Sequence, residues 1–168
     1  MIKSCVMNKQ EIYSFLKQKN IWYEVIEHDA VFDMEELSKT NIPHIECVAK
    51  NLFIRDDKKR NYYLISVKGD KHIDLKNFRK SNNARPLSFA SEKDLNSILG
   101  LIAGAVTPLG LLNDNNLKVQ FFIDKSFFNE PNLIGIHPND NTATILLKTN
   151  DLVSIIKEHK NIVNIVDI

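Results

Sequence analysis

The sequence predicts an α+β fold built on a mixed, mainly antiparallel sheet. Segments with helical periodicity are interspersed with hairpins and single strands, whereas a parallel α/β fold would alternate strand and helix regularly. The chain has 168 residues, of which 43% are hydrophobic, enough for one domain with a substantial core. No internal repeat, low-complexity segment or Pro/Ser-rich linker marks a boundary. We therefore expect a single domain over residues 1–168.

Helix starts are predicted where a capping residue is followed three positions later by an acidic residue. This spacing occurs at Asn8, Asp33 and Ser91. The first helix has Ile12, Phe15 and Leu16 on one face, the second ends before Pro43, and the third runs towards a glycine-rich stretch. Two more helices are expected at Asp74–Lys80 and at Asp151–His159, the latter capped by Thr149 or Asn150.

Strands are predicted where β-branched and aromatic residues are concentrated. Glu46–Ile54 and Tyr62–Val67 flank the polar turn Arg55–Asn61, so an antiparallel hairpin is the simplest connection. The remaining strand candidates are Ile21–Glu27, Leu117–Asp124, Leu133–Ile136, Thr142–Leu147 and an edge strand at Ile162–Val166. Polar turns are expected at Asn113–Asn116 and His137–Asn141.

The composition argues against a strongly basic nucleic-acid-binding surface, a disulfide framework, and a secreted or membrane-spanning chain. The 22 Lys and Arg nearly balance the 21 Asp and Glu, so a nucleic-acid partner would have to be held by a local patch. Cys5 and Cys47 lack metal-ligand or C-x-x-C spacing, which favours free thiols, with Cys47 in the core. The sequence has no signal-peptide core and no run of about 18 apolar residues, which predicts a soluble, cytoplasmic protein.

Standard catalytic and cofactor motifs are also missing from the sequence. It contains no G-x-G-x-x-G after a strand, no Walker loop, no G-x-S-x-G and no H-E-x-x-H, and its five histidines lack metal-ligand spacing. We therefore expect no metal and no cofactor. An enzyme of this sequence would work by positioning and electrostatics rather than through its own nucleophile.

Three local features could carry chemistry. Lys50 shares a strand face with Leu52 and Ile54, so its cation either extends to solvent at the sheet edge or points into a pocket that receives an anion. The stretch Gly100–Leu112 is small and apolar, which suits either a tight turn or a backbone that a ligand approaches closely. His137 is followed by a proline at a strand end, and is either structural or a hydrogen-bond partner for a ligand.

These features belong to a longer pattern. It comprises K-N-L-F-x-R-D from Lys50, the strand Tyr62–Ser66, G-A-V-T-P-L-G-L-L-N-D from Gly104, I-H-P-x-x-N-T-A-T-I from Ile136 and D-L-V-S-I-I-K from Asp151. In this order, the segments resemble the YbaK/prolyl-tRNA synthetase-associated domain family. The similarity is greatest to its free-standing trans-editing proteins, which deacylate alanyl-tRNA for proline.

The resemblance implies a mixed sheet that curls into a partly closed barrel surrounded by helices. It also implies hydrolysis of the ester that joins a wrong amino acid to the 3′-terminal adenosine of tRNA. The water would be activated by a ribose hydroxyl of the substrate, so that no cofactor is needed. Catalytic roles would fall on Lys50, Gly104, Thr107 and His137. Substrate-binding roles would fall on Asn51, Ala105, Val106, Pro108, Gly110 and Pro138.

Small residues around the Gly104 segment would size the pocket so that alanine enters and proline is excluded. One departure concerns Asn139 and Asp140, which follow His137-Pro138 where this subgroup is expected to have an apolar residue. Because a polar rim changes the pocket, Cys-tRNA or Ser-tRNA remains an alternative substrate. A tRNA- or synthetase-binding module without turnover is the alternative outside the enzyme class.

The implied partner is the acceptor end of an aminoacylated tRNA, with prolyl-tRNA synthetase as a second candidate. Basic side chains near the hairpin turn and the basic helix could contact tRNA phosphates, although each alone could equally be a solvated surface charge. The candidates are Lys58, Lys59, Arg60, Lys76, Arg79 and Lys80, with Lys68 and Lys71 beside them.

Overall fold

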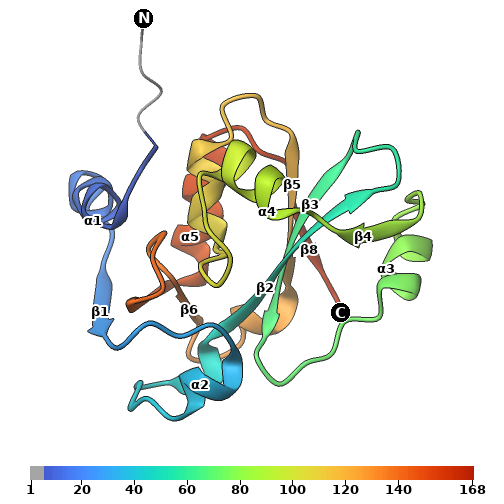
Figure 1. Ribbon diagram of the computed structural model, residues 1–168. Coiled ribbons are helices and arrows are strands. Elements are labelled where there is room, and N and C mark those ends of the chain that lie inside the picture. Colours follow the sequence, from blue (N-terminus) through green and yellow to red (C-terminus); the bar gives the residue numbers. More distant parts are fainter. Residues whose placement is uncertain (1–5) are drawn as a thin grey trace, which may run out of the picture.

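The structure, a computed structural model, describes residues 6–168 and contains two β-sheets with helices around them (Figure 1). The smaller sheet has the strand order β1-β7-β6, comprising Tyr23–Glu27, Ala143–Lys148 and Leu133–Ile136. Both of its pairings are antiparallel. A single parallel bridge between Val48 and Gly135 connects this sheet to the segment that enters the larger one.

The larger sheet has the order β4-β2-β3-β5-β8. Its strands are Leu87–Phe89, Ala49–Asp56, Tyr62–Lys68, Val119–Asp124 and Val163–Val166. Pairings β2–β3 and β2–β4 are antiparallel, whereas β3–β5 and β5–β8 are parallel. The mixed, mainly antiparallel α+β prediction is therefore confirmed. The two sheets are separate and neither is closed into a barrel, so the partly closed barrel stays a prediction.

The three predicted capping residues all begin helices. Asn8 accepts from the Glu11 N–H at 3.0 Å, Asp33 from Glu36 at 2.8 Å and Ser91 from Asp94 at 3.0 Å. Each cap satisfies an N–H that the first helical turn leaves without an intrahelical partner. The helices that follow are α1 (Lys9–Gln18), α2 (Met34–Ser38) and α4 (Glu92–Asp94), which continues as a π-helical turn over Leu95–Leu99.

The remaining helices are α3 (Leu75–Ser81) and α5 (Thr149–Glu158), with 3-10 turns at Ile45–Cys47, Pro108–Asn113 and Lys125–Phe128. The prediction that Thr149 or Asn150 caps α5 is wrong, because Lys148 occupies the cap position and the Thr149 hydroxyl donates to the Phe127 carbonyl at 2.7 Å. Glu46 and Cys47 lie in a 3-10 turn rather than in the predicted strand. Cys47 is buried as predicted, and Cys5 lies outside the described residues.

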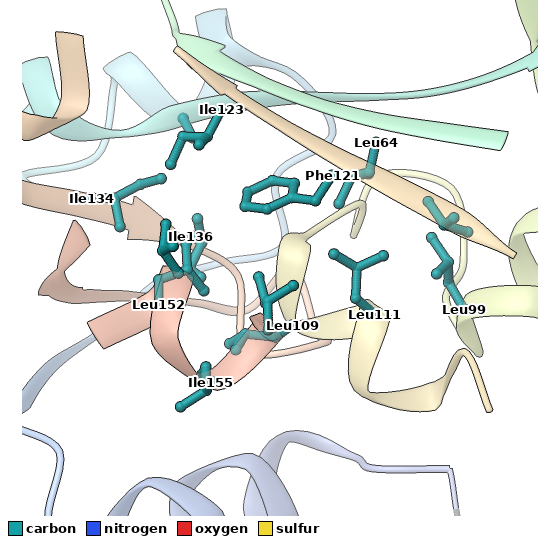
Figure 2. Close-up of a cluster of buried hydrophobic side chains, with 14 of the residues drawn as sticks. Leu64, Leu99, Leu109, Leu111, Phe121, Ile123, Ile134, Ile136, Leu152 and Ile155 are labelled. Atoms are coloured by element: carbon teal, nitrogen blue, oxygen red, sulfur yellow. The ribbon is translucent and has the colours of Figure 1, made fainter. Parts of the chain in front are cut away.

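The larger sheet is buried on both faces. On one face, Leu64 and Phe121 pack with Leu109 of the 3-10 turn, Ile136 of β6 and Leu152 of α5 (Figure 2). The other face is covered by α3 and the segment before it, with Tyr63, Ile73, Phe78 and Phe122 in contact. Figure 1 shows α1 and β1 on one side of the molecule and β4 and α3 on the other, with the β2–β3 hairpin between them. Among residues 6–168, every helix is too short or too polar to cross a lipid bilayer.

Candidate functional site

A cavity of about 300 Å³ lies where the segment around α2, the start of β2, the Gly104 loop and the end of β6 meet. It brings together Lys50, Gly104 and His137, the three features that the sequence singles out, together with Asn51 and Val106. The other lining residues are Val31, Phe32, Asp33, Met34, Leu37, Val48, Ala49, Gly135, Ile136 and Thr144. The site is therefore a mostly apolar hollow with a few polar groups, as small-molecule sites usually are.

Lys50 is half-buried in β2, and its ammonium group donates to the main-chain carbonyl of Lys71. An ammonium group has three N–H donors, so two remain for a ligand. None of the ion pairs among residues 6–168 involves Lys50. Of the two alternatives for this residue, a cation at a pocket wall fits the structure, and its charge is not neutralised by a carboxylate there.

Gly104 has a φ of +86°, a conformation that side-chain-bearing residues rarely adopt. A Cβ built at this position would lie 2.7 Å from Cδ1 of Phe32, so the absence of a side chain lets the Phe32 ring close over the loop. The main-chain N–H groups of Gly104 and Val106 have no acceptor among residues 6–168. Two donors are thus available at the cavity wall. The Ala105 N–H is not, because it donates to the Ile102 carbonyl at 3.1 Å.

Asn51 holds this loop against β2. Its side-chain amide donates to the Val106 carbonyl at 3.3 Å, and its oxygen accepts a hydrogen bond from the Ser66 hydroxyl. Because Ser66 fixes the orientation of the amide, the loop and the strand are joined by a defined contact. Asn51 therefore positions the Val106 main chain beside Lys50.

The other predicted residues of the loop do not line the cavity. Thr107 is fully buried, donates to the His137 carbonyl at 2.7 Å and caps the 3-10 turn. Pro108 occupies the first position of that turn, where its missing N–H costs nothing. A Cβ at Gly110 would lie 2.6 Å from Leu101, so Gly110 is small because the core is close-packed there. Ala105 and Pro138 are buried behind the wall.

His137 has a defined tautomer. Its Nδ1 lies 2.8 Å from the Ala143 carbonyl, which can only accept, so Nδ1 carries the proton and Nε2 is an acceptor in the neutral ring. Burial lowers the pKa of His137 below its ordinary value; the Ala143 hydrogen bond opposes this shift, and the neighbouring His28 adds to it. The imidazole is therefore neutral at neutral pH, with its Nε2 lone pair available at the cavity.

The predicted tRNA contacts lie away from the cavity, at the far end of the larger sheet. Lys58, Lys59 and Arg60 are exposed on the β2–β3 turn, and Lys76, Arg79 and Lys80 are exposed on α3, where they line a surface recess. The Arg85–Asp57 ion pair, at 2.7 Å, joins the segment after α3 to that turn. The two basic groups therefore form one region. Lys71 is not available to it, because its ammonium group is paired with the buried Asp124. Half-buried Lys68 lies 5.9 Å from the Phe127 ring centroid.

Sequence reasoning missed the wall formed by Val31, Phe32 and Met34. Phe32 is 65% exposed although it lines the cavity. The only local signal in this segment is the Asp33 cap, which predicts a helix and says nothing of a pocket. Among residues 6–168, no group of three or more His, Cys, Asp or Glu side chains is placed to hold a metal ion.

Comparison with known proteins identifies the family. Residues 28–155 match the aminoacyl-tRNA editing domain family. The chain is 40% identical to the prolyl-tRNA editing protein ProX of Acetoanaerobium sticklandii over 153 residues, covering 91% of this chain and 93% of that protein. It is 35% identical to mouse prolyl-tRNA synthetase associated domain-containing protein 1 over 144 residues, or 80% of each chain.

A solved structure described as a candidate trans-editing enzyme for prolyl-tRNA synthetase has the same fold. It superposes with a TM-score of 0.71 at 17% identity and covers 100% of this chain and 99% of its own. At that identity the match supports the fold alone.

Proposed function

The chain belongs to the aminoacyl-tRNA editing domain family, and from this premise we propose that it hydrolyses the ester of mischarged tRNA, with Ala-tRNA(Pro) as its substrate. One observation carries the proposal. Within residues 6–168, one cavity holds a lysine cation that no carboxylate pairs with, two main-chain N–H groups that have no acceptor, and a neutral imidazole acceptor. These groups suit a substrate that combines a phosphate, an ester carbonyl and hydroxyl or ammonium donors.

Each group has a role in ester hydrolysis. Lys50 binds the terminal phosphate or a ribose hydroxyl. The N–H groups of Gly104 and Val106 face the ester carbonyl and stabilise the negative charge that develops on its oxygen. His137 Nε2 accepts a hydrogen bond from the α-ammonium group or a ribose hydroxyl and so orients the substrate. Thr107 and Asn51 hold His137 and the Val106 main chain in place.

No side chain at the cavity is needed as the base. A ribose hydroxyl of the terminal adenosine takes part in activating the water, whose oxygen bonds to the ester carbonyl carbon. The ester C–O bond then breaks, and the ribose oxygen that leaves takes up the proton. The products are the free amino acid and tRNA with an intact 3′ end.

We propose that the walls of the cavity set the specificity for alanine. Val31, Met34, Leu37 and Ile136 are apolar, and Gly104 presents main chain rather than a side chain. A rigid wall rejects a larger proline ring more strongly than added apolar contact favours a smaller side chain. Cysteine and serine are close to alanine in size, so their tRNA esters are the alternative substrates.

The tRNA body lies over the basic region. Six residues of β2 separate Lys50 from the turn that carries Lys58, which places that turn roughly 20 Å from the cavity at about 3.3 Å per residue. Phosphates of the acceptor stem would thus be reached while the 3′ end occupies the cavity. We further propose that residues 1–168 are one editing domain, that it acts in the cytoplasm, and that prolyl-tRNA synthetase is a partner.

The proposal is tested by alanine release from Ala-tRNA(Pro), with Lys50→Ala and the control Lys17→Ala, an exposed lysine on α1. We expect wild type and Lys17→Ala to deacylate and Lys50→Ala to lose turnover. If wild type binds tRNA but releases no amino acid from Ala-, Cys- or Ser-tRNA, the chain is a binding module. Release of cysteine or serine instead of alanine would keep the activity and change the specificity.

A further inference from the structure

The polar residues that follow His137-Pro138 connect the site to the N-terminal helix. Asn139, which has a φ of +61°, donates through its side-chain amide to the Met7 carbonyl at 2.8 Å. Asp140 faces the opposite end of the same turn and accepts from the Thr142 main-chain N–H at 2.8 Å. These are the positions at which the sequence departs from the apolar residue expected for the subgroup. Their side chains point to neighbouring chain segments rather than to the cavity.

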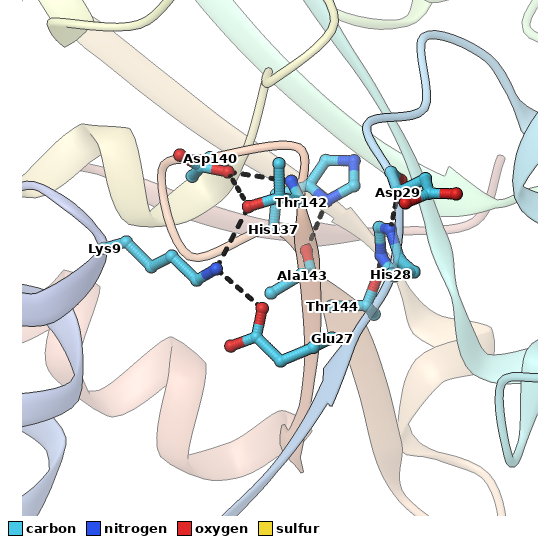
Figure 3. A network of polar contacts seen from close by, with 9 residues as sticks. All are labelled: Lys9, Glu27, His28, Asp29, His137, Asp140, Thr142, Ala143 and Thr144. Carbon is cyan, nitrogen blue, oxygen red and sulfur yellow. Dashed lines mark hydrogen bonds and ion pairs between the residues drawn. The ribbon is translucent and has the colours of Figure 1, made fainter.

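Lys9 of α1 reaches this turn. Its ammonium group donates to Glu27 of β1 at 2.7 Å and to the Thr142 hydroxyl oxygen at 3.0 Å (Figure 3). Because lysine can only donate, the Thr142 oxygen accepts from Lys9, and the hydroxyl hydrogen goes to Asp140. The side chain of Lys9 is only 19% exposed. The direction of every hydrogen bond in the chain Lys9–Thr142–Asp140 is therefore fixed.

This chain ends next to the atom that orients His137. Ala143, whose carbonyl accepts from His137 Nδ1, directly follows Thr142 and is fully buried. Thr142 is held through its hydroxyl by Lys9 and Asp140, through its N–H by Asp140, and through its carbonyl by the His28 N–H at 3.0 Å. A residue held at three groups leaves the next carbonyl little freedom. The direction of that carbonyl decides which ring nitrogen carries the proton.

We propose that Lys9 and Asp140 are positioning residues for His137: acting through Thr142, they fix the Ala143 carbonyl so that Nε2 of His137 faces the cavity as an acceptor. The proposal rests on the proposed function, because it assigns His137 a role in orienting the substrate. It adds that α1, which lines no part of the cavity, contributes to turnover.

A second lysine at the opposite end of the same helix provides a matched control. Lys19, the C-terminal cap of α1, pairs with Glu158 of α5 at 2.6 Å and is more exposed than Lys9. Both lysines tie α1 to another element through a glutamate. Only Lys9 also contacts the turn that carries His137.

The experiment compares Lys9→Met, Lys9→Arg and Lys19→Met by steady-state deacylation of Ala-tRNA(Pro) and by ¹⁵N NMR of the His137 imidazole. We expect Lys9→Met to lower kcat by about 10-fold or more, because small misplacements of an orienting group are costly, with KM changed less than about 2-fold. We expect Lys9→Arg to restore most of the rate. Lys19→Met should stay within about 2-fold of wild type, as is usual for an exposed ion pair.

NMR separates positioning from general stability. In wild type and Lys19→Met the ¹⁵N shifts should report a proton on Nδ1 of His137, and in Lys9→Met a mixture of tautomers. If Lys9→Met keeps the Nδ1–H tautomer, or lowers kcat no more than Lys19→Met does, the positioning role is refuted. The NMR comparison needs no substrate. It therefore tests the proposal even if wild type proves inactive on Ala-tRNA(Pro), which would refute the proposed function alone.

Discussion

Replacing Gly104 by alanine separates the role of this glycine in the site from its role in the fold. An alanine at a φ of +86° costs about 1–2 kcal/mol of backbone strain. Its Cβ would lie 2.7 Å from Phe32 Cδ1, so the ring and the loop must move apart by about 0.7 Å to reach ordinary van der Waals contact. Phe32 is largely exposed and can move, so the free energy of unfolding should fall by little more than the strain.

For a chain of this length, 1–2 kcal/mol corresponds to a fall in Tm of roughly 2–8 °C. The effect on activity should be much larger. The added methyl group and the displaced ring both change the wall that carries the Gly104 and Val106 N–H groups, and a shift approaching 1 Å can lower the rate by about 100-fold. We expect Gly104→Ala to remain folded at 25 °C and to lose alanine release.

Gly100→Ala is the matched control for this experiment. Gly100 also has a positive φ, +65°, and lies on the same stretch, but it is not part of the cavity wall. Both variants are measured by thermal unfolding and by alanine release from Ala-tRNA(Pro). Similar losses of Tm with activity lost only in Gly104→Ala would support the assignment. Activity of Gly104→Ala within about 3-fold of Gly100→Ala would refute it, since the backbone strain and the crowding by an added Cβ that both positions share would then explain both results.

Other variants test the remaining parts of the site. Thr107→Val leaves the His137 carbonyl without its donor and should lower the free energy of unfolding by about 1–3 kcal/mol in urea titrations. Thr107→Ser keeps a hydroxyl donor and should retain most of the wild-type free energy of unfolding. Because burial lowers the pKa of His137, the unfolded chain takes up a proton before the folded chain does as pH falls below about 6.5. The stability contributed by neutral His137 is then lost, so between pH 7 and pH 5 wild type should lose more stability than His137→Gln; equal losses would contradict this. Finally, neutralising the basic region should lower the slope of log Kd against log salt for tRNA by about one per phosphate contact removed, and an unchanged slope would exclude Lys58, Lys59, Arg60, Lys76, Arg79 and Lys80 as contacts.

Local signals predicted much of the fold. The caps at Asn8, Asp33 and Ser91 were predictable because the residues that make each hydrogen bond lie within one turn of sequence. The β2–β3 hairpin followed from two apolar segments around a polar turn. The start of α5 was mispredicted because the Thr149 hydroxyl bonds to Phe127, a partner 22 residues away that spacing does not reveal.

In the site, too, local features could be predicted from the sequence and long-range contacts could not. Motif order identified Lys50, Gly104 and His137, but their convergence depends on the Val48–Gly135 bridge and on the Thr107–His137 hydrogen bond, both long-range contacts. Gly110 belongs to the same small-residue motif as Gly104, yet its neighbours are core leucines. Local sequence cannot separate these two reasons for a glycine. It also could not assign Lys71 to the buried Asp124 rather than to a phosphate.

The central claim is that the cavity hydrolyses the alanine ester and excludes proline. The most direct test measures wild-type deacylation of Ala-tRNA(Pro) and Pro-tRNA(Pro) side by side under single-turnover conditions. We predict rapid loss of alanine, with proline released no faster than in buffer. Equal rates on the two esters would contradict size exclusion at the cavity, and no release from either would contradict the assigned reaction itself.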